Sequence, residues 1–306
     1  MTPRRLAAGR RPPALRLLKG ATIGIVGTGQ VGGSLIRRLS RYRPDMSLAA
    51  FDLDRSLAAR VGRHAHFCDS LADLVGRSDL VIVAVPVQAT ITLLPRLARL
   101  ARRRRSRRRL IVCDTATVKA TVVAAAQHYE SDFDFVGLHP LAGIEVPGWD
   151  AGDAAMFDQR AVVICPARAR ATARDRAVRV AKEVIALIGG VPVMMRPDEH
   201  DRLVAEGIGL PHILAFAAAR LGGLALEGAV LKAGSWRSLT RVAASSTVMV
   251  AGFLHQNRAH QRRVLAEFIR HLGTLERALR RPSGAALERQ LGAWQRRRRS
   301  PSSGRG

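Results

Sequence analysis

A histidine stands where a short apolar run opens into a segment rich in glycine and proline, GLHPLAGIEVPGWD at residues 137–150. The segment has too few large apolar side chains for a core strand throughout, and too much Gly and Pro for a helix. It is typical of a strand end that continues into a loop, where scaffolds often carry chemical groups. Because an imidazole titrates near operating pH, His139 is a candidate general base, and Glu145 is a candidate orienting charge or an ordinary loop carboxylate. A hydrogen-bonded structural histidine is the alternative, and the small residues Ala142 and Gly143 favour the site because they leave room for a ligand.

A glycine loop, GTGQVG, follows the first apolar run of the chain. In a dinucleotide-binding turn the first glycine allows the tight bend, the second lets the backbone approach a pyrophosphate, and the third lets the helix pack on the strand. The following helix offers free N–H groups and a partial positive charge. We therefore predict that the loop binds a dinucleotide through Gly27, Gly29, Gln30, Val31 and Gly32. A glycine turn without a ligand is the alternative reading.

The choice of dinucleotide depends on Asp52, which ends the second predicted strand, 20 residues past Gly32. A carboxylate there accepts hydrogen bonds from the ribose hydroxyls and repels a 2′-phosphate, so NAD is favoured over NADP. Arg55 lies close by and weakens that preference.

Short β-branched runs alternate with amphipathic stretches from about residue 21 to 166, and the chain from residue 168 onward is almost entirely helical in period, with one further strand at 191–195. The alternation predicts a doubly wound, mainly parallel α/β sheet of the Rossmann type, followed by an all-helical domain. The carboxyl ends of its strands would then form a crevice that includes Thr117 and His139. We predict four segments: a disordered arm (1–19), an NAD-binding domain (20–167), a helical substrate and dimerisation domain (168–295) and a disordered arginine-rich tail (296–306).

The composition limits the classes of function. A net charge of +26 makes a nucleic-acid-binding protein without turnover a rival hypothesis. The excess is arginine, however, and the tracts at 102–109 and 296–299 lack interleaved aromatic residues for stacking on bases, so we expect no specific nucleic-acid partner. Three scattered cysteines predict neither a disulfide framework nor a metal site. We also expect no membrane-spanning segment and no secretion, and hence a cytoplasmic protein.

Taken together, the motifs GTGQVGGS, AVP at 84–86, DTATVK at 114–119, HPLAGIE at 139–145, LPH at 210–212 and LTRVAAS at 239–245 resemble those of the prephenate dehydrogenases, also called cyclohexadienyl or arogenate dehydrogenases. The resemblance runs from about residue 21 to 280, and HPxAGxE after DxxxVK is far more specific than the glycine loop. It implies a Rossmann-type domain, a helical domain through which two chains dimerise, and Val85 and Pro86 at the cofactor.

The resemblance also implies a reaction. Prephenate would lose a hydride from C4 to NAD and then CO₂, which gives the aromatic 4-hydroxyphenylpyruvate of tyrosine biosynthesis. By similarity His139 would accept the hydroxyl proton, Thr117 would replace a serine bonded to that hydroxyl, and His212 and Arg241 would hold the substrate carboxylates, near Glu145. Taken alone, His212 could be a core histidine and Arg241 one more surface arginine.

The chain departs from the family where Ile208 and Gly209 replace a Ser-His pair, and where Ser246 to Val250 replaces a stretch containing Asp-Pro and tryptophan. These changes keep the reaction type but leave the substrate open between prephenate, arogenate and 4-amino-4-deoxyprephenate, a precursor of antibiotics. Other two-domain dehydrogenases, such as 3-hydroxyacid dehydrogenases, share the glycine loop but not HPxAGxE.

Overall fold

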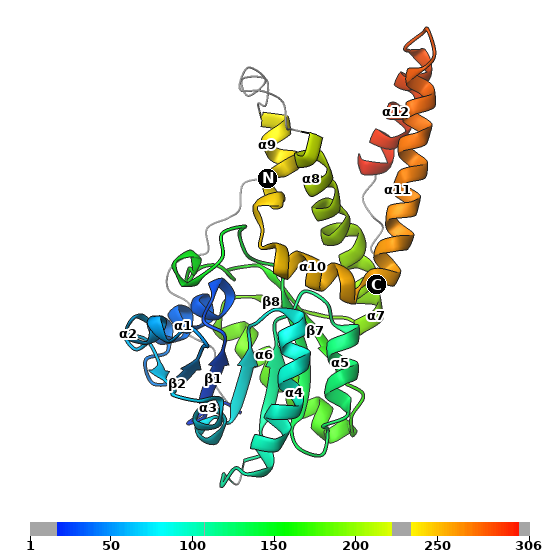
Figure 1. Ribbon diagram of the computed structural model, residues 1–306. Helices are drawn as coiled ribbons and strands as arrows, with labels where there is room; N and C mark the ends of the chain where they lie inside the picture. The colour runs from blue at the N-terminus through cyan, green and yellow to red at the C-terminus, as the bar shows by residue number, and fades with distance from the viewer. Residues whose placement is uncertain (1–16, 107, 222–233, 300–306) are drawn as a thin grey trace. The chain divides into compact units, whose positions relative to one another are not determined.

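The computed structural model describes residues 17–106, 108–221 and 234–299 (Figure 1). It divides into two compact units, Met1–Asn257 and Arg258–Gly306. Most of the arm predicted to be disordered lies outside the described residues. Its last residues, however, pack against the rest of the first unit, because Leu18 is buried and its N–H donates to the Glu183 carboxylate at 3.1 Å.

One sheet organises the first unit, with strand order β3-β2-β1-β4-β5-β6-β7-β8. All neighbours are parallel except β6 and β7, which are antiparallel, so the predicted doubly wound and mainly parallel sheet is confirmed. The two-residue strand β3 was missed. The strands are β1 (Thr22–Val26), β2 (Ser47–Phe51), β3 (His66–Phe67), β4 (Leu80–Val83), β5 (Ile111–Asp114), β6 (Asp134–Pro140), β7 (Ala161–Pro166) and β8 (Val191–Met194).

Helices cover both faces of this sheet (Figure 1). The central strands β4, β5 and β6 are buried along their whole lengths, as expected for strands covered on both sides. One apolar cluster includes α1 (Gln30–Tyr42) and α6 (Ala171–Leu187). The other includes α3 (Leu71–Arg77), α4 (Val87–Arg102) and α5 (Ala120–Gln127). A short helix α2 (Ala58–Val61) follows β2.

The boundary predicted at residue 167 falls between two strands of this one sheet, because β7 pairs with β8 through Ala161↔Val191 to Ile164↔Met194. Sequence reasoning found the strand at 191–195 but placed it in the helical domain. We propose that the nucleotide-binding domain instead continues to Met194.

A continuous helical segment follows the last strand of the sheet. It consists of α7 (Pro197–Val204), a π-helical turn (Ala205–Gly209) and α8 (Leu210–Leu221). Pro211 has no N–H to donate to the preceding turn, which explains why the regular helix is interrupted here. Next come α9 (Gly234–Thr240), a 3₁₀ turn (Arg241–Ala244) and α10 (Thr247–Gln256), which contacts α4.

Within the described residues, the helix Pro197–Leu221 is long and apolar enough to span a membrane by length and composition, and 28% of its most apolar window is buried in the fold. The core helix of a soluble protein passes the same test. The prediction of no membrane partner therefore stays a prediction.

The second unit is a helical hairpin of α11 (Arg258–Leu279) and α12 (Ala285–Arg299). The rings of His271 and Trp294 meet edge to face, 5.4 Å apart. Helix α12 continues to Arg299, into the segment predicted to be disordered, and residues 300–306 lie outside the described residues.

Candidate active site

A cavity of about 670 Å³ lies at the carboxyl ends of β4, β5 and β6. It lies where open α/β sheets bind ligands, and its size is typical of a small-molecule site. The cavity brings together every predicted site residue except Gly27, Gly32 and Asp52. These lining residues are Gly29, Gln30, Val31, Val85, Pro86, Thr117, His139, Glu145, His212 and Arg241.

The glycine loop has the geometry that a pyrophosphate requires. Gly27 has φ +89°, and a Cβ there would lie 2.5 Å from the Ala84 carbonyl oxygen. A Cβ on Gly32 would lie 1.9 Å from the Gly27 oxygen, so only glycine permits the helix to pack this closely. In contrast, a Cβ on Gly29 would meet nothing within 4 Å, because this glycine borders the cavity. Helix α1 begins here with no side-chain cap and no acidic residue in its first turn, which leaves its N–H groups free for an anion.

Asp52 lies directly behind this loop. Its Oδ2 accepts hydrogen bonds from Thr28 N at 2.6 Å and Thr28 Oγ1 at 2.9 Å, while Oδ1 accepts from Asp54 N. Arg55 is engaged elsewhere, since it donates to the Cys68 carbonyl at 2.9 Å and pairs with Asp69. The carboxylate therefore borders the nucleotide loop without a paired arginine, an arrangement that suits a ribose hydroxyl better than a 2′-phosphate.

Gln30 joins the glycine loop to the loop after β6. Its Nε2 donates to the carbonyls of Ile144 at 3.1 Å and Val146 at 2.6 Å, and its Oε1 accepts from Ile144 N. Gly143 and Gly148, with φ of +140° and +95°, allow the loop to bend around this contact. The two motifs that the sequence placed at one site are thus physically connected.

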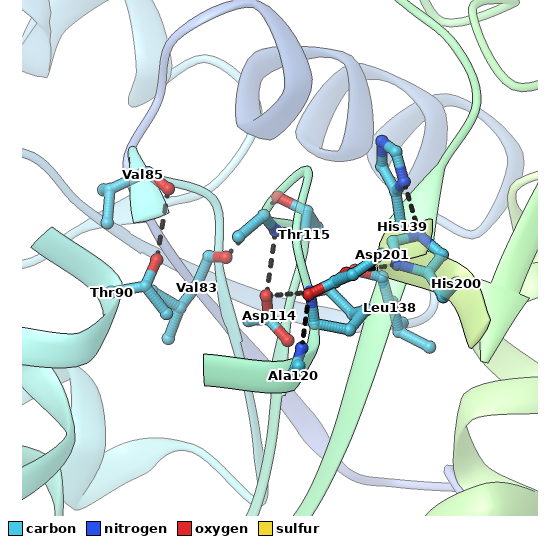
Figure 2. Close-up of polar contacts among 12 residues, drawn as sticks. Val83, Val85, Thr90, Asp114, Thr115, Ala120, Leu138, His139, His200 and Asp201 are labelled. Carbon is cyan, nitrogen blue, oxygen red and sulfur yellow. Dashed lines mark hydrogen bonds and ion pairs between the residues drawn. The ribbon is translucent and has the colours of Figure 1, made fainter. Parts of the chain in front are cut away.

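His139 lies at the end of β6 and is 6% exposed. Its Nδ1 is 2.9 Å from His200 Nε2, and His200 Nδ1 is 2.8 Å from Asp201 Oδ1, so the three side chains form a row (Figure 2). His200 and Asp201 are both 2% exposed. Burial lowers the pKa of His139 well below its ordinary value, and His200 and Lys119 act in the same direction. At neutral pH the imidazole is therefore uncharged and able to accept a proton.

A buried ion pair between Lys119 and Asp114 lies next to His139. Lys119 Nζ pairs with Asp114 Oδ2 and donates to the Leu138 carbonyl at 2.7 Å, which ties the end of β5 to β6 next to His139. Both side chains are 0% exposed. Burial raises the pKa of the Asp114 carboxyl, and the pairing with Lys119 acts in the opposite direction. The DTATVK motif thus has a structural role in addition to placing Thr117 on the cavity wall.

A histidine and an arginine face the same cavity from the helical segment. The ring of His212 meets that of Phe253 edge to face, and its Nδ1 donates to the Ile208 carbonyl at 2.8 Å, since a carbonyl only accepts. Arg241 forms an ion pair with Glu145, with its side chain 63% exposed against 19% for the glutamate. Arg241 and Glu145, both predicted to contact substrate, therefore also contact each other.

A separate cluster of possible metal ligands, His66, Cys68 and Asp73, has donor atoms within 4.8 Å of one another. Asp73 already pairs with Arg77, and burial together with the Asp73 carboxylate raises the pKa of the Cys68 thiol to about 12. Metal binding needs the thiolate, so this environment opposes it. We keep the prediction that the protein has no metal site.

Sequence reasoning missed His200 and Asp201. His200 lies 61 residues beyond His139 along the chain and Asp201 follows it, in PDEHDRL, where acidic residues after a proline indicate only a helix start. The sequence shows only an adjacent histidine and aspartate here, and their burial becomes visible only in the structure.

Comparisons with known proteins agree with this geometry. The family model "Prephenate dehydrogenase, nucleotide-binding domain" matches residues 36–194, and "Prephenate dehydrogenase, dimerization domain" matches residues 196–293. The cyclohexadienyl dehydrogenase of Zymomonas mobilis is 31% identical over 279 residues, which is 87% of this chain and 90% of that protein. A protein of Streptomyces niveus named "Probable prephenate dehydrogenase NovF" is 30% identical over 86% of this chain and 73% of its own length.

Among solved structures, the prephenate dehydrogenase of Aquifex aeolicus in complex with hydroxyphenyl propionate and NAD⁺ has a TM-score of 0.78 at 24% identity, over 91% of this chain and 97% of that one. This likeness concerns the fold. The two family models together cover both halves of the chain, and their junction coincides with the end of the sheet at Met194. The chain belongs to the prephenate dehydrogenase family of oxidoreductases.

Proposed function

We propose that this enzyme oxidatively decarboxylates prephenate to 4-hydroxyphenylpyruvate with NAD as the hydride acceptor. The observation that carries the proposal is the convergence, in one cavity, of the nucleotide loop at Gly29, the buried neutral His139 and two hydrogen-bond donors, His212 and Arg241. A ring dicarboxylate with a C4 hydroxyl requires such a set: a hydride acceptor, a base and two carboxylate partners.

The chain fits NAD at the glycine loop. Gly27 and Gly32 shape the turn, Gly29 opens onto the cavity, and the first N–H groups of α1 lack an acceptor side chain. Val85 and Pro86 would line the cofactor's path, and Asp52 would receive the ribose hydroxyls. When bound there, NAD supplies the electrophilic ring that accepts hydride from C4.

The protein's own residues would control the proton and the substrate carboxylates. His139 is uncharged and would accept the C4 hydroxyl proton, while Thr117 would bond the same oxygen. A positioned base of this kind contributes a rate factor of roughly 10²–10⁴. His212 and Arg241 would bind the carboxylates. To do so, Arg241 would release its ion pair with Glu145 and pair with a substrate carboxylate instead. Loss of CO₂ then makes the ring aromatic, which renders the reaction irreversible.

Replacing Arg241 with alanine is expected to weaken substrate binding with little effect on kcat. A charge-assisted hydrogen bond to a carboxylate contributes about 1.5–3 kcal/mol, so KM should rise roughly 10- to 150-fold. Steady-state kinetics at saturating cofactor measure this effect. Arg237→Ala on α9 is the matched control, because Arg237 is an exposed arginine outside the cavity. An unchanged KM in Arg241→Ala would show that this arginine does not bind the substrate.

The low pKa of His139 predicts the acid side of the pH profile. Because its folded-state value lies below the ordinary 6.5, the base stays uncharged as the pH falls to 6.5 and becomes protonated only at lower pH. The groups facing it are His200 on α7 and the Lys119–Asp114 pair beneath it. We expect kcat/KM to stay on its plateau down to about pH 6.5 and to fall below it, together with the stability that the neutral buried form provides. An acid limb centred near pH 7 would contradict this assignment.

A second substrate, 4-amino-4-deoxyprephenate, is the runner-up, and arogenate remains a further candidate. The observation in favour of the amino analogue is the apolar side chain of Ile208 in the cavity wall, at a position where the family resemblance led us to expect a polar residue. A site built to hydrogen-bond one C4 substituent can reject the other strongly.

The deciding experiment incubates the purified enzyme with NAD and, in turn, prephenate, arogenate and 4-amino-4-deoxyprephenate. Absorbance of the reduced cofactor reports turnover. We expect the highest kcat/KM with prephenate. A higher kcat/KM with 4-amino-4-deoxyprephenate would identify that compound as the preferred substrate. No turnover with any of the three would overturn the proposal.

We also propose that the enzyme is a cytoplasmic homodimer. The region matched by the dimerization model includes α11, which exposes the large apolar residues Ile269, Leu272 and Leu279. Exposed apolar side chains of this kind typically mark association surfaces. Light scattering on the purified protein should give twice the chain mass of 33.2 kDa.

A further inference from the structure

The hydrogen bonds around Asp201 determine which ring nitrogens of His200 and His139 carry protons. Asp201 Oδ1 accepts from Lys119 N at 2.7 Å and Oδ2 accepts from Ala120 N at 2.9 Å, so both oxygens already act as acceptors. His200 Nδ1 lies 2.8 Å from Oδ1 of the same carboxylate and must therefore carry a proton to donate.

A neutral imidazole has only one N–H group, so His200 Nε2 then has a lone pair. It can accept a hydrogen bond only if His139 Nδ1, at 2.9 Å, carries the proton. The second nitrogen of His139, Nε2, is left free to act as a base. The opposite arrangement needs a doubly protonated His200, which would add a positive charge at a side chain that is only 2% exposed.

We propose that His200 and Asp201 are positioning residues that hold His139 in the tautomer with Nε2 free to accept the substrate proton. This inference deepens the proposed function, because it rests on His139 acting as the base. When Nε2 receives the substrate proton, the Nδ1–H group still donates to His200, whose other side is held by a carboxylate. The same logic makes a buried carboxylate effective behind other catalytic histidines.

Hydrogen bonds attach this pair to elements on both sides of it in the sequence. Asp201 binds the first N–H groups of α5, and its own carbonyl accepts from Asn257 Nδ2 at 2.7 Å. His139 lies in the region matched by the nucleotide-binding model, whereas His200 and Asp201 lie in the region matched by the dimerization model. The second region would therefore orient the base as well as contribute to assembly.

Ring-¹⁵N-histidine NMR on the full-length resting enzyme tests the tautomer without turnover. We expect the His139 signals of the wild type to show a protonated Nδ1 and a bare Nε2, and His139→Asn identifies them by their disappearance. A protonated Nε2 in the resting enzyme would overturn the inference. Because this readout needs no substrate, it can fail or succeed independently of the proposed reaction.

Variants then test the catalytic consequence. His200→Leu removes the acceptor, and we expect kcat to fall roughly 10²–10⁴-fold with a much smaller change in KM, because the base is misdirected while the carboxylate partners remain. His200→Gln keeps an oxygen acceptor and should recover at least tenfold of that loss. His128→Gln, at an exposed histidine outside the cavity, is the matched control.

The pattern of outcomes separates the two claims. Wild-type kcat in a folded His200→Leu enzyme would overturn the positioning role even if His139→Asn is inactive. Full activity in His139→Asn would instead remove the proposed base. Asp201→Asn provides a further check, since an amide nitrogen facing His200 would reverse both tautomers and should shift the His139 signals accordingly. Should this variant fail to fold, the comparison of His200→Leu with His200→Gln decides the question.

Discussion

Replacing His139 with asparagine is expected to abolish turnover while leaving cofactor binding intact. The imidazole supplies the proton acceptor, and its loss should reduce kcat by roughly 10²–10⁴-fold or more. Asparagine is the informative replacement because its amide can still donate to His200 Nε2, which keeps the buried row satisfied. Steady-state kinetics with NAD and the best of the three ring substrates provide the measurement.

Cofactor binding is the control for this variant. The glycine loop is formed by other residues, so the dissociation constant for NAD, measured by protein fluorescence, should stay within about twofold. A near-normal rate in His139→Asn would remove this histidine from the role of base. Loss of both turnover and cofactor binding would mean that the substitution had disturbed the cavity itself.

The second large effect is expected on stability, at the buried pair beneath the site. Lys119→Met leaves the Asp114 carboxylate in a position that is 0% exposed, and it removes the bond to the Leu138 carbonyl. Breaking a buried ion pair by deleting one partner costs about 3–5 kcal/mol. We expect the free energy of unfolding to fall by that amount, as a lower urea midpoint.

Two further variants make this test specific. Lys182→Met replaces an exposed lysine on α6 and should leave the midpoint nearly unchanged. The double variant Asp114→Leu with Lys119→Met removes both charges and should recover much of the loss, because no unpaired charge remains buried. If Lys119→Met cost no more than Lys182→Met, the pair would contribute nothing measurable to folding.

The parts of this site that could be predicted are those whose geometry depends on residues close together in the sequence. The glycine loop needs φ above zero at Gly27 and close packing at Gly32, and only glycine meets both demands. Strand-end residues such as Thr117 and His139 were found because a parallel sheet gathers the carboxyl ends of its strands at one edge. Their convergence in one cavity follows from that topology.

The parts that could not be predicted depend on contacts between distant segments. No local pattern announces that His200 will meet His139 or that Asp201 will cap α5. The domain boundary that we propose at Met194 differs from the predicted one for a related reason. A parallel neighbour of β7 requires a crossover helix, α6, and that helix looked like the start of a helical domain.

A crystal structure of the enzyme with NAD⁺ and 4-hydroxyphenylpyruvate would show whether His139 faces the C4 oxygen of the ring. We expect the ring to lie in the cavity between Thr117 and Arg241, with His139 Nε2 within hydrogen-bonding distance of the C4 oxygen. A ring bound elsewhere, or an imidazole whose Nε2 faces away from C4, would contradict this expectation.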